Sequence, residues 1–292
     1  MRKVRLVVSG ALMLSAGLLA QTPPSRPGPT PIVQSPAPGA GRGGGFTHPE
    51  PIAFDNHDGW QSIFDGTLKN WDGDTTVWRV ENDELIAEGT PQKPLPNPQT
   101  HLIWRGGRVK DFELKVEVRL DGPGTNSGIQ YRSFEPAPGR GLPPPGQPAP
   151  GGGRAGETPP RPQSKWLLGG YQFDLDFVGR FTGQLYEGFT GRGIVAWRGD
   201  VVHTQDGEKP RLVGRLGDPD ALKGYMKIGD WNQVHLIARG NTLVHILNGQ
   251  VMAILIDDDT KIRAFEGLLG VQLEGRPDAA RVVFRHMYLK AL

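Results

Sequence analysis

The sequence contains no cysteine in 292 residues. This absence excludes disulfides, thiolate metal sites and cysteine nucleophiles, and a domain of this size can bury a sufficient core without disulfides. The seven histidines show no metal-ligand spacing such as two histidines four positions apart on a helix. Apolar residues at a helical period are also nearly absent, which argues against a helical fold.

Runs of basic residues are missing as well. The chain carries 33 Lys and Arg against 31 Asp and Glu, and three of the basic residues precede position 20. Without residues 1–20 the balance is 30 against 31, a formal charge of −1. Such a chain lacks the electrostatic footprint of a protein that binds nucleic acid or an anionic membrane. We expect neutral small molecules as partners, with no nucleic acid and no membrane span.

The first residues have the pattern of an export signal. Arg2, Lys3 and Arg5 precede an apolar stretch over residues 6–19, and Ala20 is a suitable last residue before cleavage. The stretch is too short to span a bilayer comfortably. We therefore interpret residues 1–20 as a cleaved signal peptide and expect a periplasmic or extracellular protein.

Two tracts rich in proline and glycine divide the remainder of the chain. Residues 21–58 cannot bury enough apolar surface to offset chain entropy, so we interpret them as a disordered linker. Residues 136–164 have the same composition but lie between strand-like segments. A linker between two domains is the alternative, but neither flank alone has enough strands for a closed sandwich. We favour one domain over residues 59–292 with a disordered insertion, since loop closure entropy grows only slowly with length.

The folded part is strand-like throughout. Apolar and charged residues alternate over residues 112–120, which is the pattern of a strand with one buried face. Asn248-Gly249 predicts a type I′ hairpin between residues 243–247 and 251–256. A short helix over residues 218–222 is the one weak helical signal. Further strands are expected at residues 60–64, 77–80, 85–88, 101–104, 127–134, 170–177, 183–187, 193–197, 231–239, 267–274 and 281–289. Short strands at regular spacing predict an all-β protein, an antiparallel jelly-roll β-sandwich.

An ordered series of motifs resembles one known family. The series comprises GWQSIFDGTLKNWDGD, WRVENDELIAEG, DFELKVEVRL, NSGIQYRS, GGYQFDLDF, TGQLYEG, DWNQVHLIARGNTLVHILNGQV and GLLGVQLEG. In this order the motifs resemble the 3-keto-disaccharide hydrolase family, over about residues 59–292 apart from the insertion. The resemblance implies a concanavalin A-like sandwich acting on glycosides already oxidised to a ketone at carbon 3.

The chemistry that this resemblance implies is an elimination followed by hydration. A ketone at carbon 3 acidifies the proton on carbon 2, a base removes it, and the glycosidic oxygen leaves carbon 1. Water then adds back to give the free 3-keto sugar. The site needs a base, an acid and a donor for the enolate oxygen. No redox cofactor is required, because the resemblance assigns the oxidation to a separate glycoside 3-dehydrogenase.

The segment 170–177 supplies the first candidate residues. Gln172, Asp174 and Asp176 share one face of the expected strand, opposite three apolar residues. They line the concave sheet in one interpretation and the solvated face of an edge strand in the other. Glucanases of this fold carry Glu-x-Asp-x-x-Glu on one strand, whereas this chain has Gln172 first and no second Glu. A two-carboxylate hydrolysis is therefore disfavoured.

Other candidates come from neighbouring motifs. Glu187 follows Leu-Tyr as in the family, so Glu187 or Asp174 is the expected base, and spacing does not choose between them. Arg132 is expected to hold the enolate oxygen, with a surface ion pair as its alternative. The remaining candidates, all for substrate binding, are Gln130, Tyr186, Arg192, His101 and Trp166.

Two questions stay open in the sequence. Residues 257–259 are a run of aspartates that resembles a calcium site without EF-hand spacing, so a divalent cation is an open alternative. The same fold also makes lectins, so a non-catalytic carbohydrate-binding module is the second functional reading. A cell-surface interaction protein that works through its Pro/Gly tracts is the third.

Overall fold

The computed structural model describes residues 53–96, 99–137, 164–274 and 279–292. The expected signal peptide, the linker up to residue 52 and most of the insertion lie outside the described residues. The described residues group as one compact unit. Within the described residues, no helix is long and apolar enough to cross a membrane.

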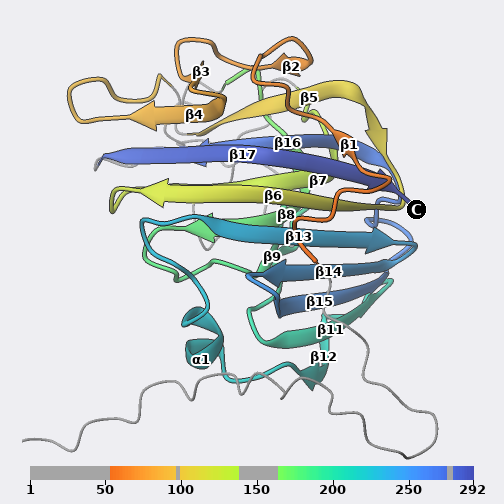
Figure 1. Ribbon diagram of the computed structural model, residues 1–292. Helices are drawn as coiled ribbons and strands as arrows, with labels where there is room; N and C mark the ends of the chain where they lie inside the picture. The colour runs from red at the N-terminus through yellow and green to blue at the C-terminus, as the bar shows by residue number, and fades with distance from the viewer. Residues whose placement is uncertain (1–52, 97–98, 138–163, 275–278) are drawn as a thin grey trace, which may run out of the picture. The chain divides into compact units, whose positions relative to one another are not determined.

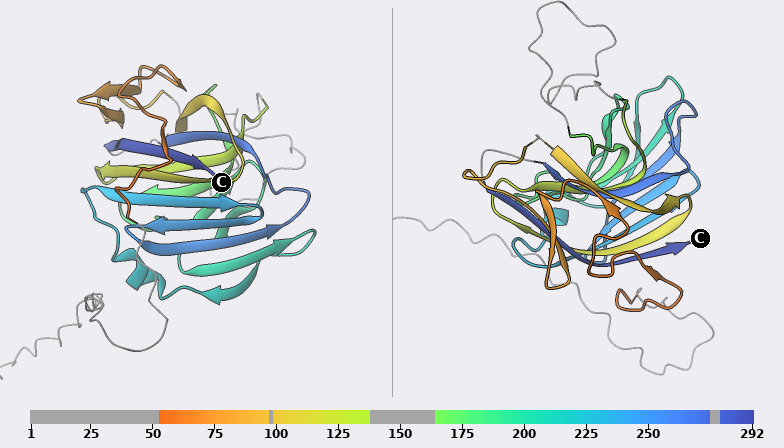
Figure 2. Two further views of the ribbon diagram at one scale, coloured as in Figure 1. Left: turned by 45° about the vertical axis from the view of Figure 1, so that its right-hand side comes forward. Right: turned by 90° about the horizontal axis from the view of Figure 1, so that it is seen from above.

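Two sheets stacked face to face build this unit (Figures 1 and 2). The larger sheet, in front in Figure 1, has ten strands, including β1 (Gln61–Ser62) on β17. Its other strands, in spatial order, are β12 (Arg211–Arg215), β11 (Asp200–Gln205), β15 (Gln250–Asp258), β14 (Thr242–Leu247), β13 (Asn232–Arg239), β6 (Phe112–Asp121), β17 (Ala280–Ala291), β4 (Glu84–Gly89) and β3 (Trp78–Glu81).

The smaller sheet has seven strands. In spatial order they are β10 (Gly193–Ala196), β9 (Leu185–Gly188), β8 (Gly169–Asp176), β7 (Asn126–Phe134), β16 (Gly267–Glu274), β5 (Gln99–Val109) and β2 (Trp71–Asp72). Helix α1 (Pro219–Lys223) begins at the N-cap Asp218, close to the expected position. The predicted jelly-roll sandwich is confirmed, although the pair β11–β15 is parallel.

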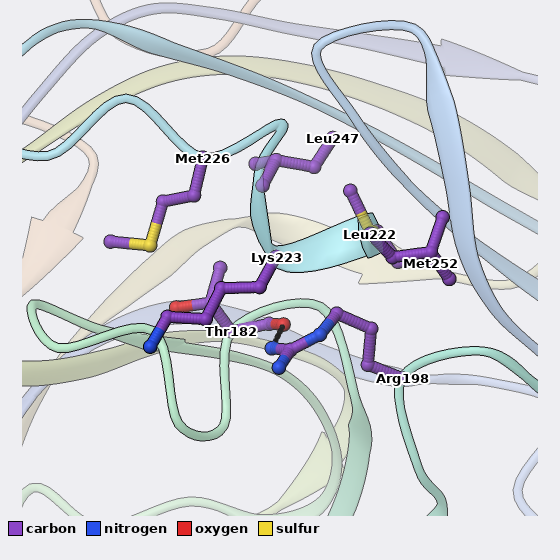
Figure 3. A pocket seen from close by; sticks show the side chains of 7 residues that line it. All are labelled: Thr182, Arg198, Leu222, Lys223, Met226, Leu247 and Met252. Carbon is purple, nitrogen blue, oxygen red and sulfur yellow. Dashed lines mark hydrogen bonds between the residues drawn. The ribbon is translucent and has the colours of Figure 1, made fainter. Parts of the chain in front are cut away.

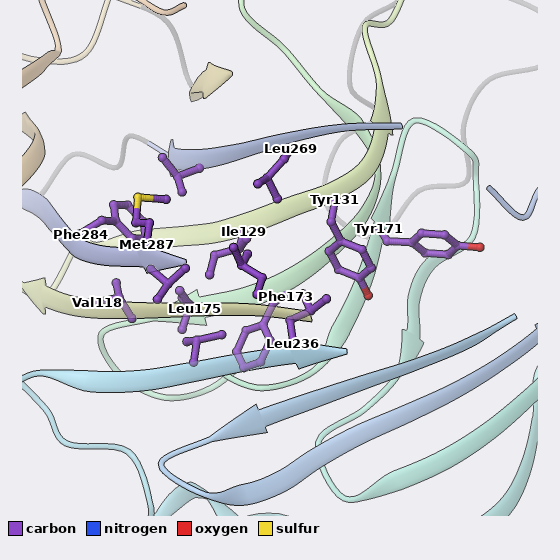
Figure 4. Close-up of a cluster of buried hydrophobic side chains, with 14 of the residues drawn as sticks. Val118, Ile129, Tyr131, Tyr171, Phe173, Leu175, Leu236, Leu269, Phe284 and Met287 are labelled. Carbon is purple, nitrogen blue, oxygen red and sulfur yellow. The ribbon is translucent and has the colours of Figure 1, made fainter. Parts of the chain in front are cut away.

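The core lies between the sheets and follows the predicted alternation. Phe112, Leu114 and Val116 on β6 are fully buried, and Phe173 on β8 faces them from the smaller sheet. Figure 4 shows this apolar layer together with the rings of Tyr131 and Tyr171, whose centroids are 5.7 Å apart. The alternating residues of β7, β8 and β16 therefore point away from the core.

The Asn248-Gly249 hairpin is also confirmed. Leu247 pairs with Gln250, so Asn248 and Gly249 form the whole loop. Their φ angles of 50° and 80° lie in the left-handed region that a type I′ turn requires. This turn sets the register of β14 against β15.

The folded domain includes residues that precede its predicted start at residue 59. The ammonium of Lys115, on β6, donates to the carbonyl oxygens of Ala53, Phe54 and Asn56 at 3.0, 3.0 and 2.9 Å. It also lies 4.6 Å from the ring centroid of Trp60. Burial lowers the pKa of Lys115, and the three carbonyl groups replace its lost hydration. The last residues of the predicted linker are thus part of the folded domain.

Candidate functional site

The candidate site is the face of the smaller sheet that points away from the core, which we call the outer face. Residues that alternate with core residues such as Ile129, Phe173 and Val271 lie on it. Strand pairing aligns them in three rows that cross the sheet from β5 to β8, and the last of these rows continues to β9. The rows are Gln99, Glu274, Asn126 and Asp176; His101, Gln272, Gly128 and Asp174; and Ile103, Gly270, Gln130, Gln172 and Tyr186.

The polar residues of β8 are not the solvated face of an edge strand. β8 pairs with β7 on one side and β9 on the other. Gln172, Asp174 and Asp176 are only 3%, 8% and 4% exposed. That alternative is therefore wrong, and these side chains form a buried polar layer that has to satisfy its own hydrogen bonds.

A glycine in the neighbouring strand makes room for this layer. A Cβ atom at Gly128 would lie 2.3 Å from the side-chain nitrogen of Gln172. The Gln172 side chain therefore lies flat over β7, where it reaches groups on β16. A larger residue at position 128 would displace it.

Glutamine amides form a chain across the outer face. Gln130 Nε2 donates to Gln172 Oε1 at 2.5 Å, and Gln172 Nε2 donates to Gln272 Oε1 at 3.0 Å. Gln272 Nε2 then donates to Gln99 Oε1 at 3.0 Å. Every amide in this chain donates in the same direction. Gln172 Nε2 carries two hydrogen atoms, so it can donate one to Gln272 and the other to Asp174.

Asp174 is the titratable centre of the outer face. Gln172 Nε2 donates to its Oδ1 at 2.8 Å, and Gln184 Nε2 donates to its Oδ2 at 2.6 Å. Burial is the largest cause that raises the pKa of Asp174, to about 7, and the charges of Glu274 and Asp176 act in the same direction. The two amides oppose the rise without cancelling it. A carboxyl group that titrates near neutrality is suited to proton transfer.

Buried polar atoms without partners also lie on the outer face. Within the described residues, His101 Nε2, Asn126 Oδ1 and Gln184 Oε1 have no hydrogen-bond partner. The Leu168 N–H donates to His101 Nδ1 at 3.3 Å, which leaves the ring proton on Nε2. Burial lowers the pKa of His101 to about 4, so the ring is neutral. An unpaired buried donor and two unpaired acceptors are what a polyhydroxylated ligand would satisfy.

Tyr186 lies beside these groups at the β9 end of the outer face. It is paired with Gln172 and only partly buried. Burial raises the pKa of its phenol first, and the charges of Asp174 and Glu274 add to the effect. Tyr186 is therefore protonated at neutral pH and can donate a proton.

Asp176 is committed to the structure. Its Oδ1 accepts the backbone N–H groups of Phe181 and Thr182 at 2.7 and 2.9 Å, and its Oδ2 accepts that of Arg180 at 2.9 Å. This carboxylate organises the loop between β8 and β9. The loop in turn delivers Gln184 to Asp174, so the contribution of Asp176 to the site is indirect.

Glu187 lies on the opposite side of the sheet from Asp174. It pairs with the inward-pointing Tyr171 of β8 and is 2% exposed. Both of its oxygens accept from Arg192, whose guanidinium also binds Asp257 of β15 at 2.6 and 3.0 Å. Tyr171 donates to the same aspartate at 2.5 Å. The structure therefore does not bring the two candidate bases together.

Regular strand alternation would place Arg132 on the same face as Gln130, but the structure does not. The Arg132 φ of 45° and the shift in register after Tyr131 mark a bulge that turns its side chain away from the row of Gln130. The guanidinium donates to the carbonyl oxygens of Lys110 and Gly240, both at 2.7 Å, and to Asp111 at 2.9 Å. Arg132 therefore joins loops at the end of the sandwich, and we do not assign it the predicted role of holding the enolate oxygen.

Trp166 and the aspartate run are also distant from Asp174. The Trp166 carbonyl accepts the N–H of His101, so Trp166 lies at the β5 edge of the smaller sheet, whereas Asp174 is on β8. Its indole N–H donates to Asp72 at 2.7 Å. Asp257 and Asp258 are bound by Arg192 and Asn241 respectively. Among the described residues, no group of three or more His, Asp or Glu is placed to hold a metal ion.

Two hollows lie outside the outer face. The larger, about 510 Å³, is an open groove beside β3 and β4; its lining includes Arg79 and Glu88, which pair with each other. The smaller, beside α1, leaves no space for a water molecule (Figure 3). It is lined by Thr182, Arg198, Leu222, Lys223, Met226, Leu247 and Met252. Neither contains a residue that the sequence singled out.

The sequence interpretation missed several residues of the outer face. Gln184, Gln272 and Glu274 were not candidates, although Gln272 and Glu274 alternate with apolar residues in GVQLEG in the same way as the β8 residues do. That pattern could have found them. Gln184 precedes β9, and only the loop held by Asp176 places it at the carboxylate.

A two-layer antiparallel sandwich with a polar outer face on its smaller sheet defines a jelly roll of the concanavalin A-like type. The resemblance in the motifs leads to the same group, and a family model matches most of the chain. This protein belongs to the family described as the 3-keto-alpha-glucoside-1,2-lyase-like domain, which matches residues 59–290. A search of curated proteins finds no match.

Solved structures with low sequence identity have similar folds. A Parabacteroides distasonis protein proposed to be a glycosyl hydrolase is 16% identical, with a TM-score of 0.46, over 80% of this chain and 99% of its own. A carbohydrate-binding module from Bacillus subtilis is 10% identical, with a TM-score of 0.44, over 76% and 96%. The Bacillus licheniformis β-glucanase is 11% identical, with a TM-score of 0.42, over 80% and 99%.

Proposed function

We propose that this protein cleaves 3-keto-α-glucosides by elimination and hydration, with Asp174 as the base. The observation that carries the proposal is a buried carboxyl group with a pKa of about 7, held by two amides on the outer face. Membership of the 3-keto-alpha-glucoside-1,2-lyase-like family supports the choice of substrate class. Glu187, the other candidate, is saturated by Arg192 on the inner face.

The proposed reaction begins with proton transfer to Asp174. Its carboxylate takes the proton from carbon 2, and the electron pair forms an enolate with the ketone at carbon 3. The C1–O bond then breaks to leave a C1=C2 double bond conjugated with the ketone. Tyr186 protonates the leaving oxygen, because its raised pKa keeps it protonated. Water finally adds its hydroxyl group to carbon 1 and a proton to carbon 2, which gives the free 3-keto sugar.

Amide groups would hold the substrate during these steps. The second N–H of Gln184 Nε2 is available to donate to the enolate oxygen, and its unpaired Oε1 accepts a sugar hydroxyl. A neutral His101 donates from Nε2 to a more distant part of the ligand. The reaction needs no redox cofactor, and a separate glycoside 3-dehydrogenase would supply its ketone.

The wild-type protein should release 3-keto-glucose from 3-keto-trehalose or 3-keto-sucrose. We expect kcat/KM to rise with pH and to level off above about pH 7, because only the ionised Asp174 accepts the proton. A rate profile that is flat from pH 5 to 9 would argue against Asp174 as the base. Assays should be run with a chelator and with added divalent cations, and no release under any of these conditions would contradict the proposed function.

The stability of the protein gives an independent measure of the same titration. The pKa of Asp174 is higher in the folded state than its ordinary value of 3.8. The folded state therefore binds the proton more tightly, and this group makes stability fall as pH rises from about 4 to about 7. Wild type and Asp174→Asn should differ in this pH slope when unfolding is followed in urea.

A non-catalytic carbohydrate-binding module is the second candidate function. The unpaired atoms of His101, Asn126 and Gln184 favour it, because they would serve ligand binding whether or not chemistry follows. Calorimetric binding of a disaccharide without any release of 3-keto-glucose from the oxidised sugar would support this function over the first.

A further inference from the structure

Trp197 differs from the other tryptophans of this chain because its side chain is exposed. All seven tryptophans lie in the described residues, and only Trp197 is among the exposed large apolar side chains, at 51%. Within the same residues its indole has no ring or hydrogen-bond partner. A ligand that covers this half-exposed indole would remove its apolar surface from water, which is favourable.

Strand pairing places Trp197 next to the proposed base. Ala196 of β10 pairs with Leu185 of β9, so the next residue, Trp197, lies opposite Gln184. Gln184 in turn holds Asp174 through its side chain. Two strand spacings therefore separate Trp197 from Asp174, about 10 Å. That span is the length of two sugar rings.

The direction of the Trp197 side chain follows from its neighbours. Ala196 is fully buried in the core, and Arg198 is 8% exposed and lies in the hollow beside α1 (Figure 3). Trp197 lies between them and points to the other side, which is the outer face. It therefore shares this face with Gln184 and Asp174.

The backbone that carries Trp197 is firmly held. The guanidinium of Arg198 donates to the carbonyl oxygens of Gly179 and Thr182 at 3.0 and 2.7 Å, and to that of Pro219 at 2.9 Å. These bonds join the β10–β11 turn to the loop that delivers Gln184. The indole and the Gln184–Asp174 pair are thus fixed relative to each other, which reduces the entropy lost on binding.

We propose that Trp197 is the stacking platform for the leaving sugar of the substrate. The C–H groups of a pyranose ring pack on an aromatic face, so the occupant is a second pyranose in a disaccharide. This inference rests on the proposed function and deepens it, since it names the part of the substrate that sets specificity. Trp197 takes this role in place of Trp166, a substrate-binding candidate from the sequence that lies at the opposite edge of the smaller sheet, beside β5.

The test compares two substrates in Trp197→Ala and Trp197→Phe. For 3-keto-trehalose we expect Trp197→Ala to raise KM by roughly three- to tenfold, as the loss of one aromatic contact predicts. For methyl 3-keto-α-glucoside, which lacks the second ring, KM should not change. Trp197→Phe should retain most of the affinity. Trp231→Ala is the matched control, because Trp231 stacks on Arg119 and Arg285 of the larger sheet.

The outcomes separate this inference from the proposed function. Equal KM changes for both substrates, or none for either, would overturn the role of Trp197 while the proposed function stands. If the wild type turns over neither substrate, the proposed function fails and calorimetry with unoxidised trehalose decides the inference. Weaker trehalose binding by Trp197→Ala than by Trp231→Ala would then support the stacking role of Trp197. Equal trehalose binding by the two variants, or no binding by the wild type, would overturn that role.

Discussion

Asp174→Asn is expected to lower kcat on 3-keto-trehalose by about 10²–10⁴-fold, the range typical for loss of a general base. Asparagine has nearly the same shape but cannot accept the carbon-2 proton. Its single side-chain oxygen keeps the hydrogen bond from Gln172, which measures 2.8 Å in the wild type. Its Nδ2 faces Gln184, whose amide has to turn so that its unpaired Oε1 accepts. The measurement is the initial rate of 3-keto-glucose release at pH 8, with KM determined in parallel.

The control for this substitution is Asp200→Asn. Asp200 is on β11 of the larger sheet and pairs with Arg215, and burial raises its pKa as well. It should leave kcat and KM unchanged. Asp174→Asn should be at least as stable as the wild type at pH 8, because it removes the cost of an ionised buried carboxylate. Wild-type turnover in Asp174→Asn would refute the assigned base.

The fold could be predicted well where strands alternate or turn tightly. The pattern over β6 and the Asn248-Gly249 loop each have a local physical cause, and the structure confirms both. β2, β11 and β12 were not predicted. β2 has only two residues, and the residues of edge strand β12 are mostly exposed, so burial leaves no alternation there. The parallel contact of β11 with β15 depends on distant parts of the chain, which local patterns do not encode.

The candidate site could be predicted only in part. Alternation correctly placed Gln172 and Asp174 on one face, but it could not say which of Tyr186 and Glu187 would share that face. The pairing of Glu187 with Tyr171 decides this, and it depends on where β9 begins. Arg132 was misplaced because its left-handed backbone conformation has no signal in the surrounding residues. Gln184 depended on a loop shape that the Asp176 carboxylate imposes.

The inner cluster of Glu187, Arg192 and Asp257 has a structural role in this account. Burial raises the pKa of Glu187, and Arg192 opposes the rise. Burial also acts against the charge on Asp257, but hydrogen bonds from Arg192 and Tyr171 outweigh it and lower its pKa. The cluster connects β9 and the turn before β10 to β15 of the other sheet. It therefore fixes the edge of the smaller sheet that carries Tyr186.

Arg192→Met is expected to destabilise the protein strongly, because it leaves two buried carboxylates without their cation. Breaking a buried pair costs about 3–5 kcal/mol, which for a domain of this size lowers Tm by on the order of 10 °C. Thermal unfolding at pH 7.5 measures the effect. The kcat of the folded fraction, assayed well below Tm, should stay within about twofold of the wild type, a change of only ~0.4 kcal/mol in the barrier.

Glu187→Gln distinguishes the structural role from a catalytic one. It removes one charge of the cluster while keeping a group that can accept from Arg192, so its loss of stability should be smaller than that of Arg192→Met. Its kcat should be preserved, since Glu187 faces the core and Asp174 faces the opposite side of the sheet. If Glu187→Gln instead abolished turnover at unchanged Tm, the base would be Glu187, and the substrate would have to reach the inner side of β9.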